Sequence, residues 1–365
     1  MILFFTIERG CLLPVFILNA ERVGSLILLD PNFFLEISFR SLTFSVTAVF
    51  AIDMSQVKIL SAEKLDYKDG DSILIGNVKV QLGDYFISAP KVFIDSDDSG
   101  KPFQARFIED VSLESKTLNI HAPEMNIDLT NSILKCFSTV DTIVETTIVD
   151  KNSKQAVLKT WYQEFNYKTG LAKGNAQRLV SASSVDNRKL AKTNFVYDKL
   201  QVESDDIEMQ TKEGKVEYAV FLGDAIASDD NQRTEAQEIY FFPAQNIIKA
   251  ETDVRIVYAD EKKPAYVFSD AVIYEKEKNI LSAFSRSNTA NSKIYREDSF
   301  GKARQLILNL DEKQKPDNAV LTGLAYSQIN DKAITGHELL LDIKDQKIKT
   351  LVGRPKTLLF SKVEE

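Results

Sequence analysis

Few side chains in this 365-residue sequence are of the types that carry out catalysis or bind metals. The two histidines, His121 and His337, are far apart in sequence and occupy repeat positions that hold Ser88 and Gln237 in other copies. A histidine that acts as an acid, a base or a metal ligand needs partner side chains around it. We interpret both as variation within a repeat, so the sequence predicts no cofactor and no metal site.

The sequence has two cysteines, Cys11 and Cys136. Disulfide frameworks and thiolate metal sites need clustered cysteines, so neither is predicted. Cys136 is interpreted as a small buried hydrophobic residue.

Acidic residues gather at Asp95 to Asp98, Asp205-Asp206 and Asp229-Asp230, without the alternation and closing glutamate of a calcium loop. We interpret these clusters as solvated turns. The G-x-S-x-G, H-E-x-x-H, Walker and G-x-G-x-x-G motifs are missing, so no enzymatic function is predicted. The paired carboxylates of a glycoside hydrolase need only be close in space. A β-solenoid enzyme that acts on polysaccharide, or a cell-surface adhesin, is therefore the alternative.

Charge is mixed along the whole chain, with 53 acidic and 45 basic residues and a formal net charge of −8. A surface that follows a phosphate backbone needs a basic run or patch. The sequence has no such run, so nucleic acid is not an expected partner.

Residues 1–51 are unusually apolar and are interpreted as a hydrophobic export signal or a membrane anchor. The apolar stretch Ser41 to Phe50 is shorter than the roughly twenty residues of a membrane span, which favours a signal peptide. Val49-Phe50-Ala51 fits a cleavage site, and acidic residues further upstream indicate that the start codon is set too early. The competing interpretation is a retained anchor over Gly10 to Leu29, which two charged residues interrupt.

Beyond residue 52 apolar and polar residues alternate almost everywhere, as in Val78 to Leu82 and Asp253 to Tyr258. This period of two is typical of strands with one buried face. Turn signals such as Lys68-Asp69-Gly70-Asp71 separate the strands, each expected to be about 5 to 8 residues long. No long stretch has the apolar spacing of a capped amphipathic helix, which sets aside the α/β folds. The sequence therefore predicts an all-β chain.

Two segments repeat one another, Ile87 to Asp95 and Ile120 to Asp128, and both fit I-x-A-P-x-Φ-x-I-D. A glycine followed by a small polar residue recurs at Gly76-Asn77, Gly174-Asn175 and Gly223-Asp224. Units of this size cannot bury an apolar face alone. They predict a stack in which each unit covers the next.

The glycines and prolines of these repeats indicate where strands bend. Glycine relieves the Cβ clash that a bend or bulge imposes. Pro90 and Pro123 cannot donate to a central ladder, so they are expected at corners or strand starts. We assign β-repeats to residues 52–200 and a second, more divergent set to residues 201–365.

Three segments follow one another as an A-x-x-Φ-x-Y opening, a G-N-V strand and a second opening: Ala62 to Gly70, Ile75 to Val80 and Ile87 to Val92. This order resembles the OstA-like (LptA-type) lipopolysaccharide-transport family. The resemblance is strongest over residues 61–130 and poorest between 135 and 200. It implies a repetitive open β-jellyroll, in which two sheets of many short antiparallel strands fold over one another as a solenoid.

The same resemblance implies a non-enzymatic periplasmic protein that carries the acyl chains of lipid A, the lipid part of lipopolysaccharide, between the inner and outer membranes. Retention of residues 1–51 implies attachment to the inner membrane. Unpaired terminal strands imply that other OstA-like components add strands there and that copies associate end to end. A purely structural filament without lipid affinity is a third hypothesis.

Ten apolar residues are the candidate lining of the lipid groove. They are Ile73, Ile75, Val78, Val80, Leu82, Phe86, Val92, Ile94, Ile120 and Ile127. Burying an acyl chain releases about 0.8 kcal/mol per methylene, so such a groove needs no catalytic group. A slip of one residue exchanges the two faces of a strand, which leaves open the face that lines the groove. For each residue the alternative is ordinary packing in a core.

Overall fold

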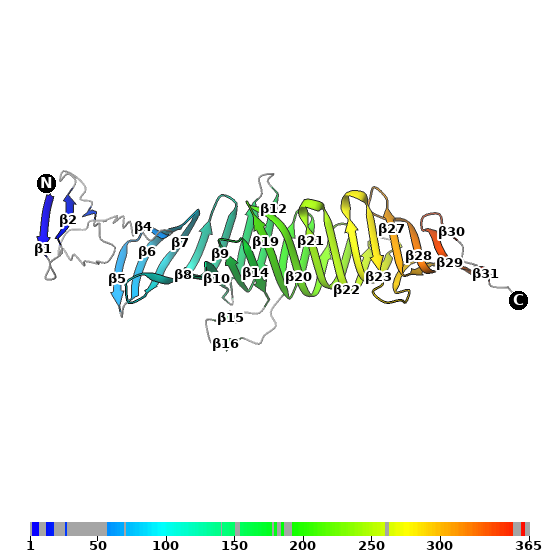
Figure 1. The fold of residues 1–365 in the computed structure, drawn as a ribbon, viewed down its shortest axis with the longest axis horizontal. Coiled ribbons are helices and arrows are strands. Elements are labelled where there is room, and N and C mark those ends of the chain that lie inside the picture. The colour runs from blue at the N-terminus through cyan, green and yellow to red at the C-terminus, as the bar shows by residue number, and fades with distance from the viewer. Residues whose placement is uncertain are drawn as a thin grey trace. The chain divides into compact units, whose positions relative to one another are not determined.

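The structure is a computed structural model that is built almost entirely of β-strands (Figure 1). It describes residues 2–6, 12–17, 26–27, 57–68, 71–139, 141–149, 154–176, 179–180, 184–185, 192–259, 263–352 and 359–361. The chain divides into two compact units. Unit 1 comprises Met1–Val149, Lys159–Gly170 and Arg178–Asn187, and unit 2 comprises Asp150–Leu158, Leu171–Gln177 and Arg188–Glu365. Within the described ranges, no helix has the length and apolar character needed to cross a membrane.

The strands pair in antiparallel fashion in both units. Those of unit 1 are β1 (Ile2–Thr6), β2 (Leu12–Ile17), β3 (Leu26–Ile27), β4 (Val57–Ser61), β5 (Lys64–Lys68), β6 (Asp71–Leu82), β7 (Tyr85–Ser96), β8 (Pro102–Glu114), β9 (Leu118–Asp128), β10 (Ile133–Phe137), β11 (Val144–Val149), β13 (Tyr162–Asn166), β15 (Leu179–Val180) and β16 (Ser184–Val185). Strand β12 (Gln155–Thr160) has residues in both units.

Unit 2 continues the same construction with longer strands and two short 3-10 turns. Its elements are β14 (Leu171–Asn175), β17 (Thr193–Tyr197), β18 (Leu200–Ser204), β19 (Asp206–Lys212), β20 (Lys215–Ser228), β21 (Gln232–Phe242), η1 (Pro243–Gln245), β22 (Ile247–Tyr258), β23 (Ala265–Glu275), η2 (Lys276–Lys278), β24 (Ile280–Phe284), β25 (Ser292–Arg296), β26 (Ser299–Ala303), β27 (Gln305–Leu310), β28 (Pro316–Ile329), β29 (Lys332–Asp342), β30 (Lys347–Val352) and β31 (Leu359–Ser361).

Five long strands bend near their middle at two consecutive residues with positive φ. The pairs are Gly76-Asn77 in β6, Glu109-Asp110 in β8, Gly223-Asp224 in β20, Thr252-Asp253 in β22 and Gly323-Leu324 in β28. The register with a neighbouring strand shifts at each of them. Such a β-bulge turns the strand without ending its ladder. We call each of these bends a corner.

The proline repeats lie on the strands that face the corners. Ala89 pairs with Val78 and Lys91 with Ile75, so Pro90 stands opposite the bulge of β6. Pro123 stands opposite the bulge of β8 in the same way. The expected bends at both prolines are thereby confirmed. The predicted Gly174-Asn175 site differs, because these two residues end β14.

Each corner divides its strand into halves that belong to two different sheets. In unit 1, β5 pairs with the first half of β6 and β4 with the second half. Similarly, β10 and β11 pair with opposite halves of β9. In unit 2, β19 and β18 divide β20 between them, and β27 and β26 divide β28. Each unit therefore holds two sheets that are joined along one edge by the corners.

The two sheets of a unit face each other across their side chains. In unit 2, the ring of Phe195 from β17 lies 5.3 Å, between centroids, from the ring of Phe221 in the other sheet. A Cβ atom placed on Gly301 of β26 would lie 2.9 Å from Cδ1 of Leu321 in that same opposing sheet. Glycine at position 301 therefore leaves the room that Leu321 fills.

The predicted all-β jellyroll of two folded-over antiparallel sheets is confirmed. Many strands have the expected 5 to 8 residues, but others are longer and reach 14 residues in β20 and β28, because a bulge bends the ladder without breaking it. The proposed signal stretch at 41–50 lies outside the described residues. Of residues 1–51 the structure describes only the backbone of β1, β2 and β3. The division of the repeats at residue 200 stays a prediction.

Candidate functional site

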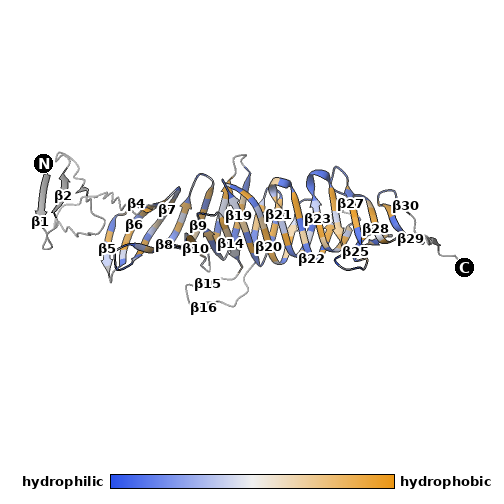
Figure 2. Ribbon diagram, in the orientation of Figure 1, coloured by the Kyte–Doolittle hydropathy of each residue, from blue (hydrophilic) through white to orange (hydrophobic). Residues whose placement is uncertain are grey.

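Each unit encloses an apolar interior between its two sheets. Figure 2 shows hydrophobic and hydrophilic residues alternating along the strands. The inward side chains of unit 1 that are at most 1% exposed include Leu74, Val78, Val92, Phe107, Val111, Leu113, Ile120, Ala122, Met125 and Leu134. Side chains buried to this extent pack against one another. The interior is therefore closed in this structure.

Seven of the ten predicted groove residues are buried in this interior. They are Val78, Val80, Leu82, Val92, Ile94, Ile120 and Ile127. Ile73 and Ile75 lie on the opposite face of β6, because Ser72 and Leu74 take the inward positions. Phe86 is 48% exposed, on the face of β7 opposite the buried Ile87. Lipid contact by any of the ten stays a prediction.

The interior also contains residues that the alternation alone did not identify, among them Phe107 and Leu113. The inward positions of β7 are odd-numbered up to Ala89 and even-numbered from Val92 onward. The inward parity of β7 changes across Pro90, which lies opposite the two bulge residues of β6. The prolines of the repeats are therefore the sequence signal that marks where the inward parity changes.

A polar pair interrupts the apolar interior of unit 1. Thr146 Oγ1 donates to Gln163 Oε1 at 2.7 Å, and both residues are buried. Gln163 is paired in register with Cys136, which is fully buried. Burial raises the pKa of the Cys136 thiol, so this cysteine stays protonated. Its interpretation as a small buried hydrophobic residue is confirmed.

The edge of each unit opposite its corners is where the strand-end turns of the two sheets meet, and we call this edge the seam. In unit 1, Tyr85 begins the half of β7 that lies in the same sheet as β4. Tyr167 follows β13, which lies in the other sheet. Tyr85 Oη donates to the backbone oxygen of Tyr167 at 3.4 Å. The Tyr85 ring also meets the Phe165 ring edge-on, with centroids 6.2 Å apart. These contacts close the seam of unit 1.

Polar contacts bridge the seam of unit 2 at three places. Asp229 Oδ2 lies 3.9 Å from Lys276 Nζ, Asn231 Nδ2 donates to Gln314 Oε1 at 3.2 Å, and Gln346 Nε2 donates to Glu297 Oε2 at 3.2 Å. Asp229, Asn231 and Glu297 lie in turns of the sheet that contains β18. Their partners lie in turns of the sheet that contains β19. Among the described residues, these side-chain contacts join the two sheets at this edge.

Two tyrosines lie just inside the seam of unit 2, one on each sheet. Tyr258 ends β22, Tyr274 is next to last in β23, and each is 2% exposed. Neither hydroxyl has a hydrogen-bond partner among the described residues. Burial raises the pKa of Tyr274 to about 12, with a further contribution from the Asp229 carboxylate, and raises the pKa of Tyr258 well above its ordinary value. Both side chains are therefore neutral hydrogen-bond donors.

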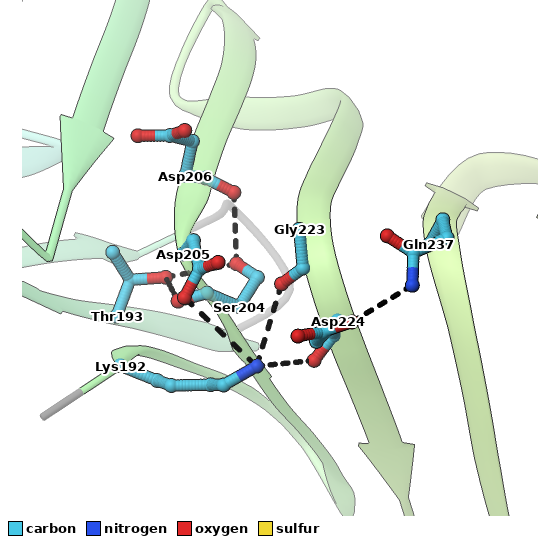
Figure 3. Close-up of polar contacts among 8 residues, drawn as sticks. All are labelled: Lys192, Thr193, Ser204, Asp205, Asp206, Gly223, Asp224 and Gln237. Carbon is cyan, nitrogen blue, oxygen red and sulfur yellow. Dashed lines mark hydrogen bonds and ion pairs between the residues drawn. The ribbon is translucent and has the colours of Figure 1, made fainter.

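A cluster of polar residues braces the first corner of unit 2 (Figure 3). Lys192 Nζ donates to the backbone oxygens of Gly223 at 3.4 Å and Asp224 at 2.5 Å. It also lies 3.9 Å from Asp205 Oδ1. The Asp224 carboxylate accepts a hydrogen bond of 2.7 Å from Gln237 Nε2 on the next strand. The lysine charge meets carbonyl dipoles and a carboxylate, which stabilises the bend.

Other side chains of types that could react or bind a metal lie on the surface. His121 Nε2 is 3.1 Å from Asp110 Oδ1 at the corner of β8, and both side chains are exposed. In the turn after β7, Asp97 Oδ1 accepts from the backbone nitrogens of Ser99 and Lys101, each at 2.9 Å. Within the described ranges, no three His, Cys, Asp or Glu side chains are grouped so that they could hold a metal ion.

The fold and its interior define a β-jellyroll protein whose distinctive feature is an apolar space between two facing sheets. Residues 61–246, about half of the chain, match a family described as "LptA/(LptD N-terminal domain) LPS transport protein". The chain belongs to this family of lipopolysaccharide transport proteins. The match begins where the sequence resemblance begins and extends through residues 135–200, where that resemblance was poor.

Among solved structures, the chain is similar to LptH, described as the LptA-homologous periplasmic component of the lipopolysaccharide transport device of Pseudomonas aeruginosa. The two are 11% identical over 45% of this chain and 95% of that chain, with a TM-score of 0.26. No curated protein matches the chain.

Proposed function

We propose that this protein is a periplasmic component of lipopolysaccharide transport that holds the acyl chains of lipid A between the two sheets of its jellyroll. The observation that carries the proposal is the apolar interior in a chain of a lipopolysaccharide transport family. An acyl chain is a flexible hydrocarbon, and a space lined by aliphatic and aromatic side chains binds it without any specific polar contact.

Binding requires the two sheets to separate, because the inward side chains are packed against one another. These side chains then lose apolar contacts with one another and gain apolar contacts with the acyl chain in their place. Transfer of about ten methylenes from water gains about 8 kcal/mol. Hydrogen bonds between neutral or exposed side chains, such as those at the seam, are worth about 0.5 to 1.5 kcal/mol each. The Asp229 carboxylate is 7% exposed, but it keeps the hydrogen bonds from the backbone nitrogens of Asn231 and Gln232 when Lys276 moves away. The gain from the lipid therefore exceeds the loss at the seam.

The outer edges of the terminal described strands are the sites proposed for partners. Among the described pairings, β4 and β5 pair only with β6, and β30 and β31 pair only with β29. Unpaired backbone groups accept a strand from another protein. Other transport components, or further copies of this chain, add strands at these edges. Retention of residues 1–51 attaches the protein to the inner membrane.

Competition between two unlabelled ligands tests the proposal. The full chain is expected to bind fluorescent lipid A, and unlabelled lipid A is expected to displace the probe. The deacylated saccharide of lipid A lacks the hydrocarbon that the interior holds, so it should leave the probe bound at the same concentration. Equal displacement by the deacylated saccharide would show that sugar and phosphate, and not acyl chains, are recognised.

A further inference from the structure

We infer that lipid enters unit 2 sideways, through the seam, and that its acyl linkages are bound there by the hydroxyls of Tyr258 and Tyr274. This inference rests on the proposed function, since it assigns the entry route and the polar contacts of the same interior. It follows from the different construction of the two long edges of the unit.

The corner edge is covalently continuous and cannot part. There the backbone of β20, β22 and β28 runs from one sheet into the other. The first corner is further braced by Lys192, which binds two carbonyl oxygens and approaches a carboxylate. An opening at this edge would require neighbouring strands to break the backbone hydrogen bonds between them.

The seam has no covalent connection of this kind. The turns of the two sheets meet through side chains, at the pairs formed by Asp229 and Lys276, Asn231 and Gln314, and Glu297 and Gln346. Glu297 and Gln346 are exposed, so water replaces their hydrogen bond when it breaks. Rotation about the corners therefore opens the interior along the seam.

The tyrosines inside the seam supply the second observation. A buried hydroxyl without a partner is rare, because its lost hydration is not compensated. Tyr258 and Tyr274 both lack partners among the described residues and sit on opposite sheets at the mouth of the seam. Both are neutral donors, which suits the carbonyl oxygens of the ester and amide bonds that join acyl chains to a saccharide. The hydrocarbon then extends past them toward the corner.

A reversible lock across the seam tests the entry route. Glu297→Cys with Gln346→Cys places one thiol on each sheet, and a short bis-methanethiosulfonate reagent joins them until reductant is added. The matched control shares one residue: Lys263→Cys with Glu297→Cys joins two turns of the same sheet, where Lys263 Nζ lies 2.5 Å from Glu297 Oε1. Both pairs are made in the full chain with Cys11→Ser, and Cys136 remains because it is buried.

We expect the cross-linked 297/346 pair to take up fluorescent lipid A at least tenfold more slowly than the reduced pair, and the 263/297 pair to change less than twofold. Equal uptake by the locked and reduced 297/346 pair, or equal slowing of both pairs, overturns the entry route and leaves the proposed function standing. Absence of uptake by the reduced protein as well means that the proposed function itself is wrong.

Removal of each hydroxyl tests the polar contacts separately. Tyr258→Phe and Tyr274→Phe keep the ring and are expected to release lipid A at least threefold faster. The thermal midpoint of the lipid-free protein should stay the same or rise, because an unpaired buried hydroxyl is lost. Unchanged release from both variants overturns the assignment of these tyrosines.

Discussion

Phe221→Ala is expected to lower the free energy of unfolding by about 3 to 5 kcal/mol, the range for a large-to-small change in a closed core. The Phe221 side chain is completely buried and meets the ring of Phe195 from the facing sheet. Its loss leaves a cavity that the two ladders cannot collapse to fill. Urea denaturation followed by circular dichroism measures the effect.

The next residue on the same strand is the control. Leu222 is 38% exposed and points away from the interior, so Leu222→Ala is expected to cost about 0.5 kcal/mol or less. Both changes remove a large apolar side chain from β20, from two adjacent positions on opposite faces. Equal losses for the two variants would contradict the placement of Phe221 between the sheets.

Gly223→Ala is expected to destabilise the protein by about 3 kcal/mol through two effects at the corner. Gly223 has a φ of +79°, which an alanine adopts only with strain. A Cβ atom there would also lie 2.8 Å from the Cβ of Asp205, whose backbone nitrogen donates to the oxygen of Gly223 at 3.2 Å. The Cβ of Asp205 is attached directly to the backbone and cannot swing aside, so the corner must shift.

Gly83→Ala isolates the backbone effect. Gly83 has a φ of +57° in the turn between β6 and β7, and no atom would lie within 4 Å of an added Cβ. Its replacement is expected to cost about 1 kcal/mol, from the left-handed conformation alone. The same denaturation experiment compares the two variants. Similar losses would mean that close packing at the corner contributes nothing.

The repetitive two-sheet fold could be predicted because its determinants are local. Alternation identifies strands, and Gly76, Gly223, Pro90 and Pro123 mark the corners through the conformations that glycine and proline allow or forbid. The predicted length of 5 to 8 residues was too short for the strands that continue through a corner, such as β20 and β28. A bulge and a turn both interrupt the apolar alternation, and only the hydrogen-bond ladder tells them apart.

The inward face was predicted in part, and the seam was not predicted. Ile73 and Ile75 were grouped with Val78 because all three are aliphatic residues of one strand, but the inward position next to them belongs to Leu74. The contact between Tyr85 and Tyr167 joins residues from strand ends distant in sequence. Such contacts depend on which turns meet in space, and no local pattern records that.

The most direct measurement is photo-crosslinking of lipopolysaccharide from the two faces of β6. A small diazirine amino acid at Val80, which is buried between the sheets, is expected to crosslink the lipid, as is one at the buried Ile127 of β9. The same amino acid at Ile73 or Ile75, on the opposite face, is expected to give no more than background. Crosslinking that is equal on both faces, or absent from Val80 and Ile127, would contradict the binding of acyl chains between the sheets.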